Sequence, residues 1–229
     1  MENHVTIPKS SLDFLVQVKE NNNKPWFEIN KPQYLIELNH IENFAGALLK
    51  ELSKSDVLEN ASGKKSVYRI YRDIRFSKDK TPFKTFWGGS YKRATAARRG
   101  GYYFHLEKNS FFAGGFWGPN AADLKRIRAE FAQDPETFQK ILHSKSFISN
   151  FGTLQGEQLK TAPKGFDIDH PAIELLRFKQ FLVMKRFTDE EVLSPDFLQQ
   201  ALDAFKNMRP FFDYMSEVLT TDANGTSIL

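Results

Sequence analysis

The stretch SVYRIYRDIRFSKDKTPFKT, from Ser66 to Thr85, alternates apolar and polar residues over its first half and then contains turn-forming residues. Successive side chains of a β-strand point to opposite faces of a sheet. The alternation therefore predicts a strand over Val67–Phe76 and a turn over Ser77–Pro82. A short turn between two strands is typical of antiparallel neighbours.

Arg72 falls on the apolar face of this predicted strand, between Ile70 and Ile74. A guanidinium group that faces a core must be paired and hydrogen-bonded, because its desolvation is otherwise too unfavourable. We therefore expect Arg72 to be largely buried and bonded to a carboxylate or to an anion in a cavity. The first alternative is a structural ion pair and the second is a ligand contact, and the sequence leaves both open.

The same reasoning predicts further elements on both sides of this stretch. The other expected strands are Phe83–Tyr91, Gly101–Glu107, Phe111–Trp117 and Gln180–Phe187. The expected helices are Leu12–Lys19 capped by Ser11, Pro25–Leu52 with a new helix starting at Pro32, Leu124–Phe131, one from Pro135 to Leu142, His170–Phe178, and a C-terminal helix from Ser194 that Pro210 must kink or break. This order predicts an α+β fold, with an antiparallel β-meander packed against N-terminal and C-terminal helices.

Length and composition indicate one well-buried domain. The chain has 229 residues, of which 41% are hydrophobic and 14% aromatic. We expect a flexible N-terminus over residues 1–10, a single domain over 11–219 and a disordered tail over 220–229. With no cysteine and no apolar run of about 20 residues, the sequence predicts a soluble cytoplasmic protein without disulfides, thiolate chemistry or a membrane partner.

Positive charge is concentrated in one block. The segment Lys64–Arg99 holds twelve basic and two acidic residues, whereas the whole chain has a net charge of +4, so the remainder is net negative. Such a block is typical of a protein that binds phosphate, carboxylate or nucleic acid. The alternative is a solvated basic face, or pairing with acidic residues within the fold.

The candidate ligand-binding residues belong to this block and to the next predicted strand. Arginine offers planar forks for carboxylate or phosphate, lysine offers flexible ammonium groups, and tyrosine can stack or hydrogen-bond. The candidates are Arg69, Arg72, Arg75, Lys78, Lys80, Lys84, Tyr71 and Tyr103.

His105 and Glu107 are the candidate catalytic residues. With Tyr103 they share one face of the predicted strand Gly101–Glu107. A histidine beside a carboxylate can act as a general base with its orienting group, although a surface His–Glu pair has the same spacing. The segment Asp167–Glu174 resembles a metal cluster, but its residues fit a helix N-terminus better, so we predict no metal and no cofactor.

Four segments resemble an uncharacterised family known mainly from bacteria, domain of unknown function 2461. They are Glu20–Phe27, Arg69–Lys84, Gly101–Glu107 and Pro163–Ala172, and the resemblance extends from about Leu12 to Leu219. It implies one α+β domain and no established activity.

The sequence thus favours a protein that binds a small phosphorylated or carboxylated ligand at a basic, aromatic sheet. Whether it is also an enzyme stays open, and no reaction type is indicated. Single-stranded nucleic-acid binding is the alternative, with arginines on phosphates and tyrosines on bases. A noncatalytic protein-interaction module is a third hypothesis, and the oligomeric state is open.

Overall fold

The computed structural model describes residues 5–222 and 224–229. Contacts divide the chain into two compact units. The first unit comprises the residues up to Tyr91, Tyr103–Phe112 and Arg186–Asp203, and the second comprises Lys92–Tyr102, Ala113–Lys185 and the residues from Ala204 onward. The predicted single domain over 11–219 and its flexible ends stay predictions, and residues 1–4 of the expected N-terminal segment lie outside the described residues.

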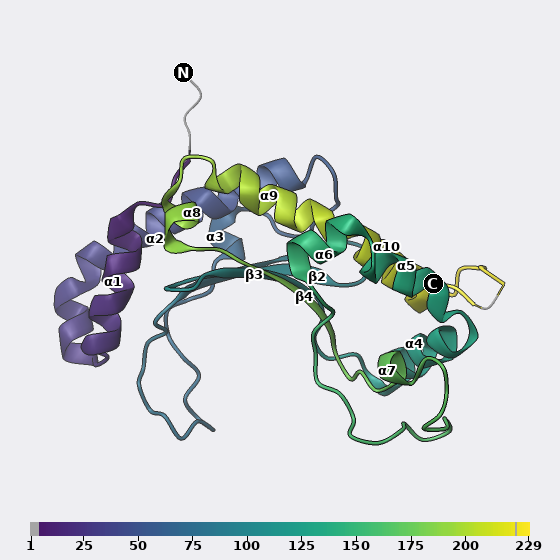
Figure 1. Cartoon of the computed structure of the whole chain (residues 1–229). Coiled ribbons are helices and arrows are strands. Elements are labelled where there is room, and N and C mark those ends of the chain that lie inside the picture. The colour runs from purple at the N-terminus through teal and green to yellow at the C-terminus, as the bar shows by residue number, and fades with distance from the viewer. Residues whose placement is uncertain (1–4, 223) are drawn as a thin grey trace. The chain divides into compact units, whose positions relative to one another are not determined.

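The sheet is the antiparallel meander that the sequence predicts (Figure 1). Its four strands are β1 (Trp87–Lys92), β2 (Gly101–Leu106), β3 (Phe111–Phe116) and β4 (Phe181–Arg186), and they lie in the order β1-β2-β3-β4. The α+β fold class is therefore confirmed. Expected strands over Gly101–Glu107, Phe111–Trp117 and Gln180–Phe187 match β2, β3 and β4 to within one residue at each end.

In the first unit, helices cover one face of the strands. These helices are α1 (Lys9–Glu20), α2 (Lys24–Leu52), α3 (Gly63–Ser66), α8 (Asp189–Leu193) and the start of α9 (Phe197–Asn207). Phe104 of β2 contacts Phe44 of α2 at a ring-centroid distance of 6.5 Å, and Phe44 stacks on Phe197 at 5.4 Å. Because side chains alternate along β2, Phe104 faces this core while its neighbours Tyr103 and His105 face the other side.

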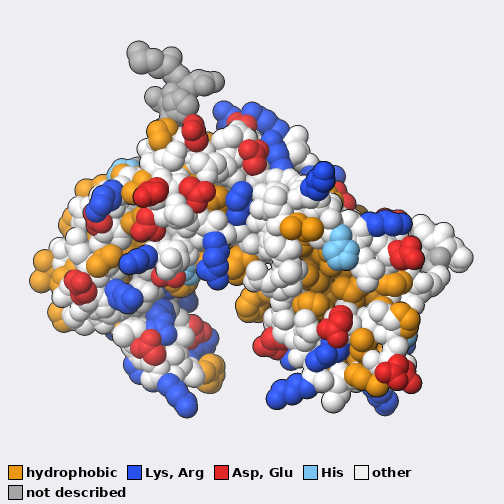
Figure 2. All heavy atoms as spheres, viewed as in Figure 1, with side chains coloured by type: hydrophobic (Ala, Val, Ile, Leu, Met, Phe, Trp, Pro, Cys, Tyr) orange, Lys and Arg blue, Asp and Glu red, His pale blue; other side chains and the backbone are white. Residues whose placement is uncertain are grey.

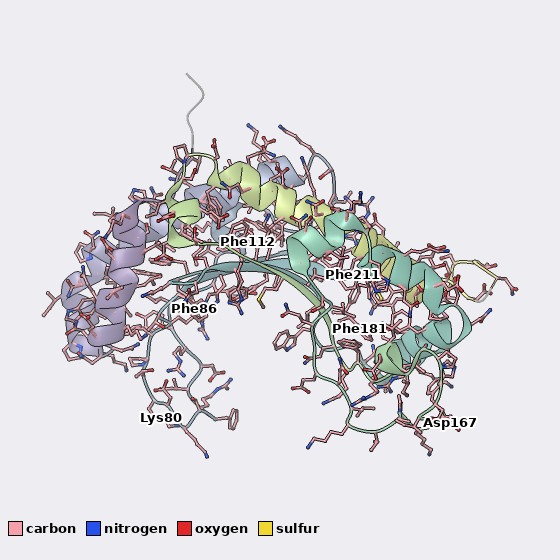
Figure 3. All side chains as sticks on the ribbon, viewed as in Figure 1. Lys80, Phe86, Phe112, Asp167, Phe181 and Phe211 are labelled. Carbon is pink, nitrogen blue, oxygen red and sulfur yellow. The ribbon has the colours of Figure 1, made fainter. Side chains whose placement is uncertain are left out.

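The second unit has its own aromatic core. It contains α4 (Ala121–Gln133), α5 (Pro135–Leu142), α6 (Lys145–Phe151), α7 (Ile173–Leu176) and α10 (Arg209–Thr220). Phe131 stacks on Phe138 at 4.6 Å and contacts Phe181 of β4 at 5.8 Å, and Phe138 lies 6.0 Å from Phe211 (Figure 3). No helix of the described residues is both long and apolar enough to cross a bilayer.

Two predictions about the N-terminal helices are wrong. Ser11 does not cap α1, which begins after Pro8, because its hydroxyl donates instead to the buried carboxylate of Glu37 at 2.7 Å. Pro32 does not start a new helix but lies inside the continuous α2. Pro32 is exposed, and on an exposed helix face the carbonyl that loses its N–H partner can be hydrated.

Two of the later helices, α4 and α5, begin at residues whose own side chains cap them. The side chain of Asn120 accepts from the Asp123 N–H and begins α4, and Asp134 does the same for α5. A break before Pro210 is confirmed, since α9 ends at Asn207 and α10 begins at Arg209. The helix expected over His170–Phe178 shrinks to the four residues of α7, and α6 and α8 were not predicted.

Gly115 allows β3 and β4 to approach each other closely. Its φ is +140°, and a Cβ atom there would lie 2.1 Å from the carbonyl oxygen of Phe181. We predict that Gly115→Ala lowers the free energy of unfolding by about 2–4 kcal/mol, because both the conformation and the contact become strained. Gly118→Ala is the matched control, since nothing lies within 4 Å of its Cβ. Urea denaturation of both variants measures the difference, and equal stability would contradict it.

Candidate functional site

Residues 67–86 form a hairpin that projects from the sheet on the side opposite α2 and α9 (Figure 1). Its two arms pair at the isolated bridge Tyr71↔Phe83, and Val67 at its start pairs with Gly89 of β1. The predicted strand over Val67–Phe76 is therefore wrong, and the expected strand over Phe83–Tyr91 starts only at Trp87. Lys84 explains part of the departure from a continuous strand, because its ammonium group binds backbone carbonyls that a neighbouring strand would otherwise pair with. It donates to the carbonyls of Arg69 at 2.6 Å and Tyr71 at 2.7 Å.

The base of the hairpin is held by Asn22, which precedes α2. Its side-chain amide accepts from the Phe83 N–H at 3.0 Å and donates to the Phe83 carbonyl at 3.0 Å. The Phe83 ring also stacks on Phe27 of α2 at 4.1 Å. Asn22 thus provides the two backbone hydrogen bonds that a neighbouring strand would otherwise make with Phe83.

Arg72 makes the carboxylate contact that we expected, but it is not largely buried. Its Nη1 donates to Asp79 Oδ2 at 2.5 Å, to the Thr81 carbonyl at 3.1 Å and to the Thr81 hydroxyl. Its side chain remains 27% exposed. The backbone N–H of Thr81 and the Arg72 guanidinium lower the pKa of Asp79 to about 2. Among the residues that the structure describes, Arg72 donates from Nη1 alone, so Nε and Nη2 remain for another acceptor.

Arg75, Lys78 and Lys80 lie farther out on the hairpin than Arg72, among acidic side chains (Figures 2 and 3), whereas Arg69 precedes Arg72 on the arm nearer the sheet. Arg75 forms two hydrogen bonds to Asp73, at 2.9 and 2.7 Å, and the Asp73 pKa is lowered as a result. Lys80 donates to the Ile74 carbonyl at 2.9 Å. Arg69 and Lys78 are exposed.

A pocket of about 450 Å³ opens beside the hairpin. Its lining residues are Arg72, Asp73, Asp79, Thr81, Phe83, Lys84, Thr85 and Phe86. Of the predicted ligand-binding residues, the structure brings Arg72 and Lys84 together here. Burial and the nearby charges of Arg69 and Arg72 lower the pKa of the Lys84 ammonium. Asp73 and Asp79 also line this pocket, so the two cations share it with two carboxylates.

His105 forms a hydrogen-bonded row with its neighbours on the same face of β2. The Tyr103 hydroxyl donates to Nδ1 at 2.7 Å, and Nε2 donates to Glu107 Oε1 at 2.9 Å. The imidazole is also stacked between Phe86 at 4.1 Å and Phe111 at 4.6 Å. The expected shared face is confirmed. In this arrangement both ring nitrogens are already used, and the imidazole is neutral.

Phe86 lies between the two halves of the predicted site. It lines the pocket that contains Arg72 and Lys84, and its ring covers one side of His105 (Figure 3). His105 and Glu107 are not among the lining residues of this pocket, nor are Arg69, Tyr71, Arg75, Lys78, Lys80 and Tyr103. Tyr71 packs instead against Phe83 at 5.4 Å, and Tyr103 stacks on Tyr68 at 6.1 Å.

Sequence reasoning missed Phe86, Thr81 and Thr85 as pocket residues. The available signal was the run Thr81–Phe86, in which hydroxyl and aromatic side chains surround Lys84. In the second unit, the Asp167–Glu174 segment makes local contacts. Asp167 accepts from the Asp169 N–H, and His170 Nδ1 accepts from the Ala172 N–H, whereas α7 begins after Ala172 without a side-chain cap.

A family model described as "Conserved hypothetical protein (DUF2461)" matches residues 10–214. No curated protein and no solved structure matches the chain. The family resemblance seen in the sequence is confirmed over most of its length.

Loss of the Asn22 side chain should loosen the hairpin. Asn22→Ala removes both hydrogen bonds to Phe83, and we expect the amides of residues 67–86 to exchange with solvent about tenfold faster or more. Asn21→Ala is the control, because within the described part of the chain the Asn21 side chain donates to the Gln17 carbonyl of α1 and not to the hairpin. Hydrogen exchange measured by mass spectrometry tests this, and equal exchange in both variants would refute the role of Asn22.

The stability of the protein should depend on pH through His105. Burial lowers the His105 pKa below its usual value of about 6.5, and Glu107 partly opposes this shift. The unfolded chain therefore takes up a proton first as the pH falls. The free energy of unfolding decreases below about pH 6.5, and this decrease ends once folded His105 is protonated as well.

NMR titration of the imidazole measures this pKa directly. Glu107→Gln should lower the His105 pKa further, because it removes the charge that favours the imidazolium. A His105 pKa at or above 6.5, or a rise in the variant, would show that burial does not dominate.

Proposed function

The chain belongs to the conserved hypothetical protein family DUF2461, whose description names no activity, and we propose that it binds a small anionic ligand. The ligand, phosphorylated or carboxylated, occupies the pocket that contains Arg72 and Lys84. The observation that carries the proposal is the lowered pKa of Lys84, caused by burial and by two neighbouring guanidinium groups. An anion beside Lys84 would favour the charged ammonium and so oppose this shift.

The pocket offers suitable donors. Lys84 uses two N–H groups on carbonyl oxygens and keeps a third, and Arg72 keeps Nε and Nη2. Thr85 also lines the pocket, whereas the Thr81 hydroxyl already donates to Asp79, and the rings of Phe83 and Phe86 form an apolar wall. This set suits a compact oxyanion joined to an apolar group. Because the chain has no cysteine, a reducing cytoplasmic location is part of the proposal.

Two observations favour this proposal over nucleic-acid binding. Most basic side chains of the hairpin are bonded to its own carboxylates and carbonyls. In the second unit, Arg93 is bonded to Asp213 at 2.6 Å with a side chain only 2% exposed, and Arg99 is paired with Asp123. These arginines therefore do not form an open row of free guanidinium groups for successive phosphates.

The row of Tyr103, His105 and Glu107 is part of the proposal in a supporting role. Stacked against Phe86, it fixes the apolar wall of the pocket. A catalytic step would require Phe86 to move so that His105 reaches the ligand.

The test compares variants of two lysines in the same hairpin. Inorganic phosphate, pyrophosphate and citrate are titrated by calorimetry at constant ionic strength. We expect Lys84→Met to weaken binding at least tenfold, because it removes the central cation. Lys80→Met is the matched control, since Lys80 also donates to a hairpin carbonyl but lies outside the pocket, and it should change affinity less than twofold.

A second variant separates binding from folding. Thr85→Val keeps the volume of the pocket wall, so it should weaken binding severalfold without lowering the melting temperature. Equal affinity of wild type, Lys84→Met and Thr85→Val would refute the proposal. Salt-sensitive binding of a single-stranded oligonucleotide, unaffected by Thr85→Val, would favour the nucleic-acid alternative.

A further inference from the structure

Lys84 differs from Arg72, the other cation that lines the pocket, in the groups that it binds. Arg72 is paired with a carboxylate. The Lys84 nitrogen donates instead to two uncharged acceptors, the carbonyls of Arg69 at 2.6 Å and Tyr71 at 2.7 Å. Among the residues that the structure describes, no carboxylate is paired with Lys84.

The two carboxylates of the pocket are bonded to other cations. Asp79 Oδ2 accepts from Arg72 at 2.5 Å, and both oxygens of Asp73 accept from Arg75, at 2.9 and 2.7 Å. A carboxylate bonded directly to an amine would favour its charged form, whereas neutral carbonyls favour it less. The surroundings of Lys84 therefore stabilise an ammonium group less than an ion pair would.

The hydrogen bonds of Lys84 also suit an uncharged amine. Such an amine has two N–H groups and one lone pair, and the two carbonyls accept both N–H groups. The lone pair then takes the position of the third N–H of an ammonium group. Burial and the guanidinium groups of Arg69 and Arg72 lower the Lys84 pKa, which raises the fraction of free amine near neutral pH. A free amine attacks ketones and aldehydes.

We propose that Lys84 forms an imine with a 2-oxo acid that carries an apolar side chain. The proposal rests on the anionic-ligand pocket proposed above and names the class of its ligand. Arg72 holds the carboxylate through Nε and Nη2, which make no hydrogen bond within the described part of the chain. The ketone carbon is bonded directly to that carboxylate, so a single compact ligand meets both cations of the pocket.

The remainder of the pocket sets the side chain of the acid. Its volume of about 450 Å³ leaves room beyond the carboxylate and the ketone, and the rings of Phe83 and Phe86 line it. An apolar side chain on the acid packs against these rings and keeps water from the amine.

The reaction needs no oxidant or reductant. The Lys84 nitrogen bonds to the ketone carbon, the π electron pair of the C=O bond moves to oxygen, and a proton passes from nitrogen to that oxygen to give a carbinolamine. The hydroxyl group then takes up a proton from solvent and leaves as water, and the nitrogen lone pair forms the C=N bond. The carboxylate of the bound acid favours the protonated iminium that results.

Reductive trapping on the full chain tests the imine. Wild type is incubated near neutral pH with 4-methyl-2-oxopentanoate and sodium cyanoborohydride, which reduces an imine to a stable secondary amine. Peptide mass spectrometry should find Lys84 heavier by the mass of the acid less one oxygen atom. Lys78 and Lys80 are internal controls outside the pocket and should be modified about tenfold less or lower still. Equal modification of the three lysines, or none at Lys84, would overturn the proposal.

Two related compounds test the ligand class. The methyl ester of the same acid has the more electrophilic ketone but no carboxylate, so recognition by Arg72 predicts that it modifies Lys84 about tenfold more slowly. Pyruvate lacks the apolar side chain and should also react more slowly, by severalfold. Trapping of the ester at an equal or higher rate would overturn the carboxylate contact, and the same result with pyruvate would overturn the role of Phe83 and Phe86.

Lys84→Arg separates the imine from anion binding. It keeps a cation and removes the amine, so the intact chain should lose the adduct while its affinity for inorganic phosphate stays within about threefold. Lys80→Arg is the matched control and should keep both properties. Phosphate binding by wild type without an adduct would overturn the imine and leave the anion pocket standing. An adduct that forms equally with acid and ester, without phosphate binding, would refute both.

Discussion

The alternation of side chains along β2 is the constraint on which the rest of the first unit depends. Phe104 must face the helices because its ring fills the space beside Phe44. Since successive residues of a strand point to opposite faces, Tyr103 and His105 are then directed to the other side. The alternation that directs Phe104 into the core therefore also places the hydrogen-bonded row of Tyr103, His105 and Glu107 on the other face. A shift of the strand register by one residue would exchange the two faces.

On the face of β2 that carries His105, aromatic side chains from outside the strand cover the imidazole. His105 on a two-layer fold would otherwise stand in water, but Phe86 and Phe111 cover both faces of its ring. Burial then keeps the imidazole neutral, and the neutral ring can accept from Tyr103 while it donates to Glu107. The row is thus a consequence of aromatic packing as much as of hydrogen bonding.

The basic block has two distinct roles. Most of its charge stabilises the hairpin, where Asp73 and Asp79 hold Arg75 and Arg72, and Lys84 replaces ladder hydrogen bonds by binding two carbonyls. At the pocket wall, Arg72 and Lys84 lie together with Asp73 and Asp79, and burial and the neighbouring guanidinium groups lower the pKa of Lys84. Net charge along the sequence therefore overstates the surface available to a ligand, because self-pairing has to be subtracted first.

The sequence by itself determined the features that depend on local chemistry. Strand period predicted the meander, and the prolines at positions 135 and 210 predicted the start of α5 and the break before α10, whereas α4 begins at Ala121, three residues before the expected Leu124. The α+β class and the shared face of Tyr103, His105 and Glu107 followed from the same rules. These signals lie within a few residues of the element that they specify.

The tertiary structure decided everything that needed a partner distant in the chain. Ser11 could not be recognised as a donor to Glu37, nor Asn22 as a clamp on Phe83, because 26 and 61 residues separate the partners. The alternation over Val67–Phe76 is real, yet that segment lies beyond the sheet edge and forms a hairpin held by side chains. Arg72 found its carboxylate only seven residues away, in Asp79, but whether it lay in a core or at a pocket mouth depended on the fold around it. The reason is physical: a residue's type fixes which bonds it can make, whereas burial and the nearest partner are set by how the chain packs.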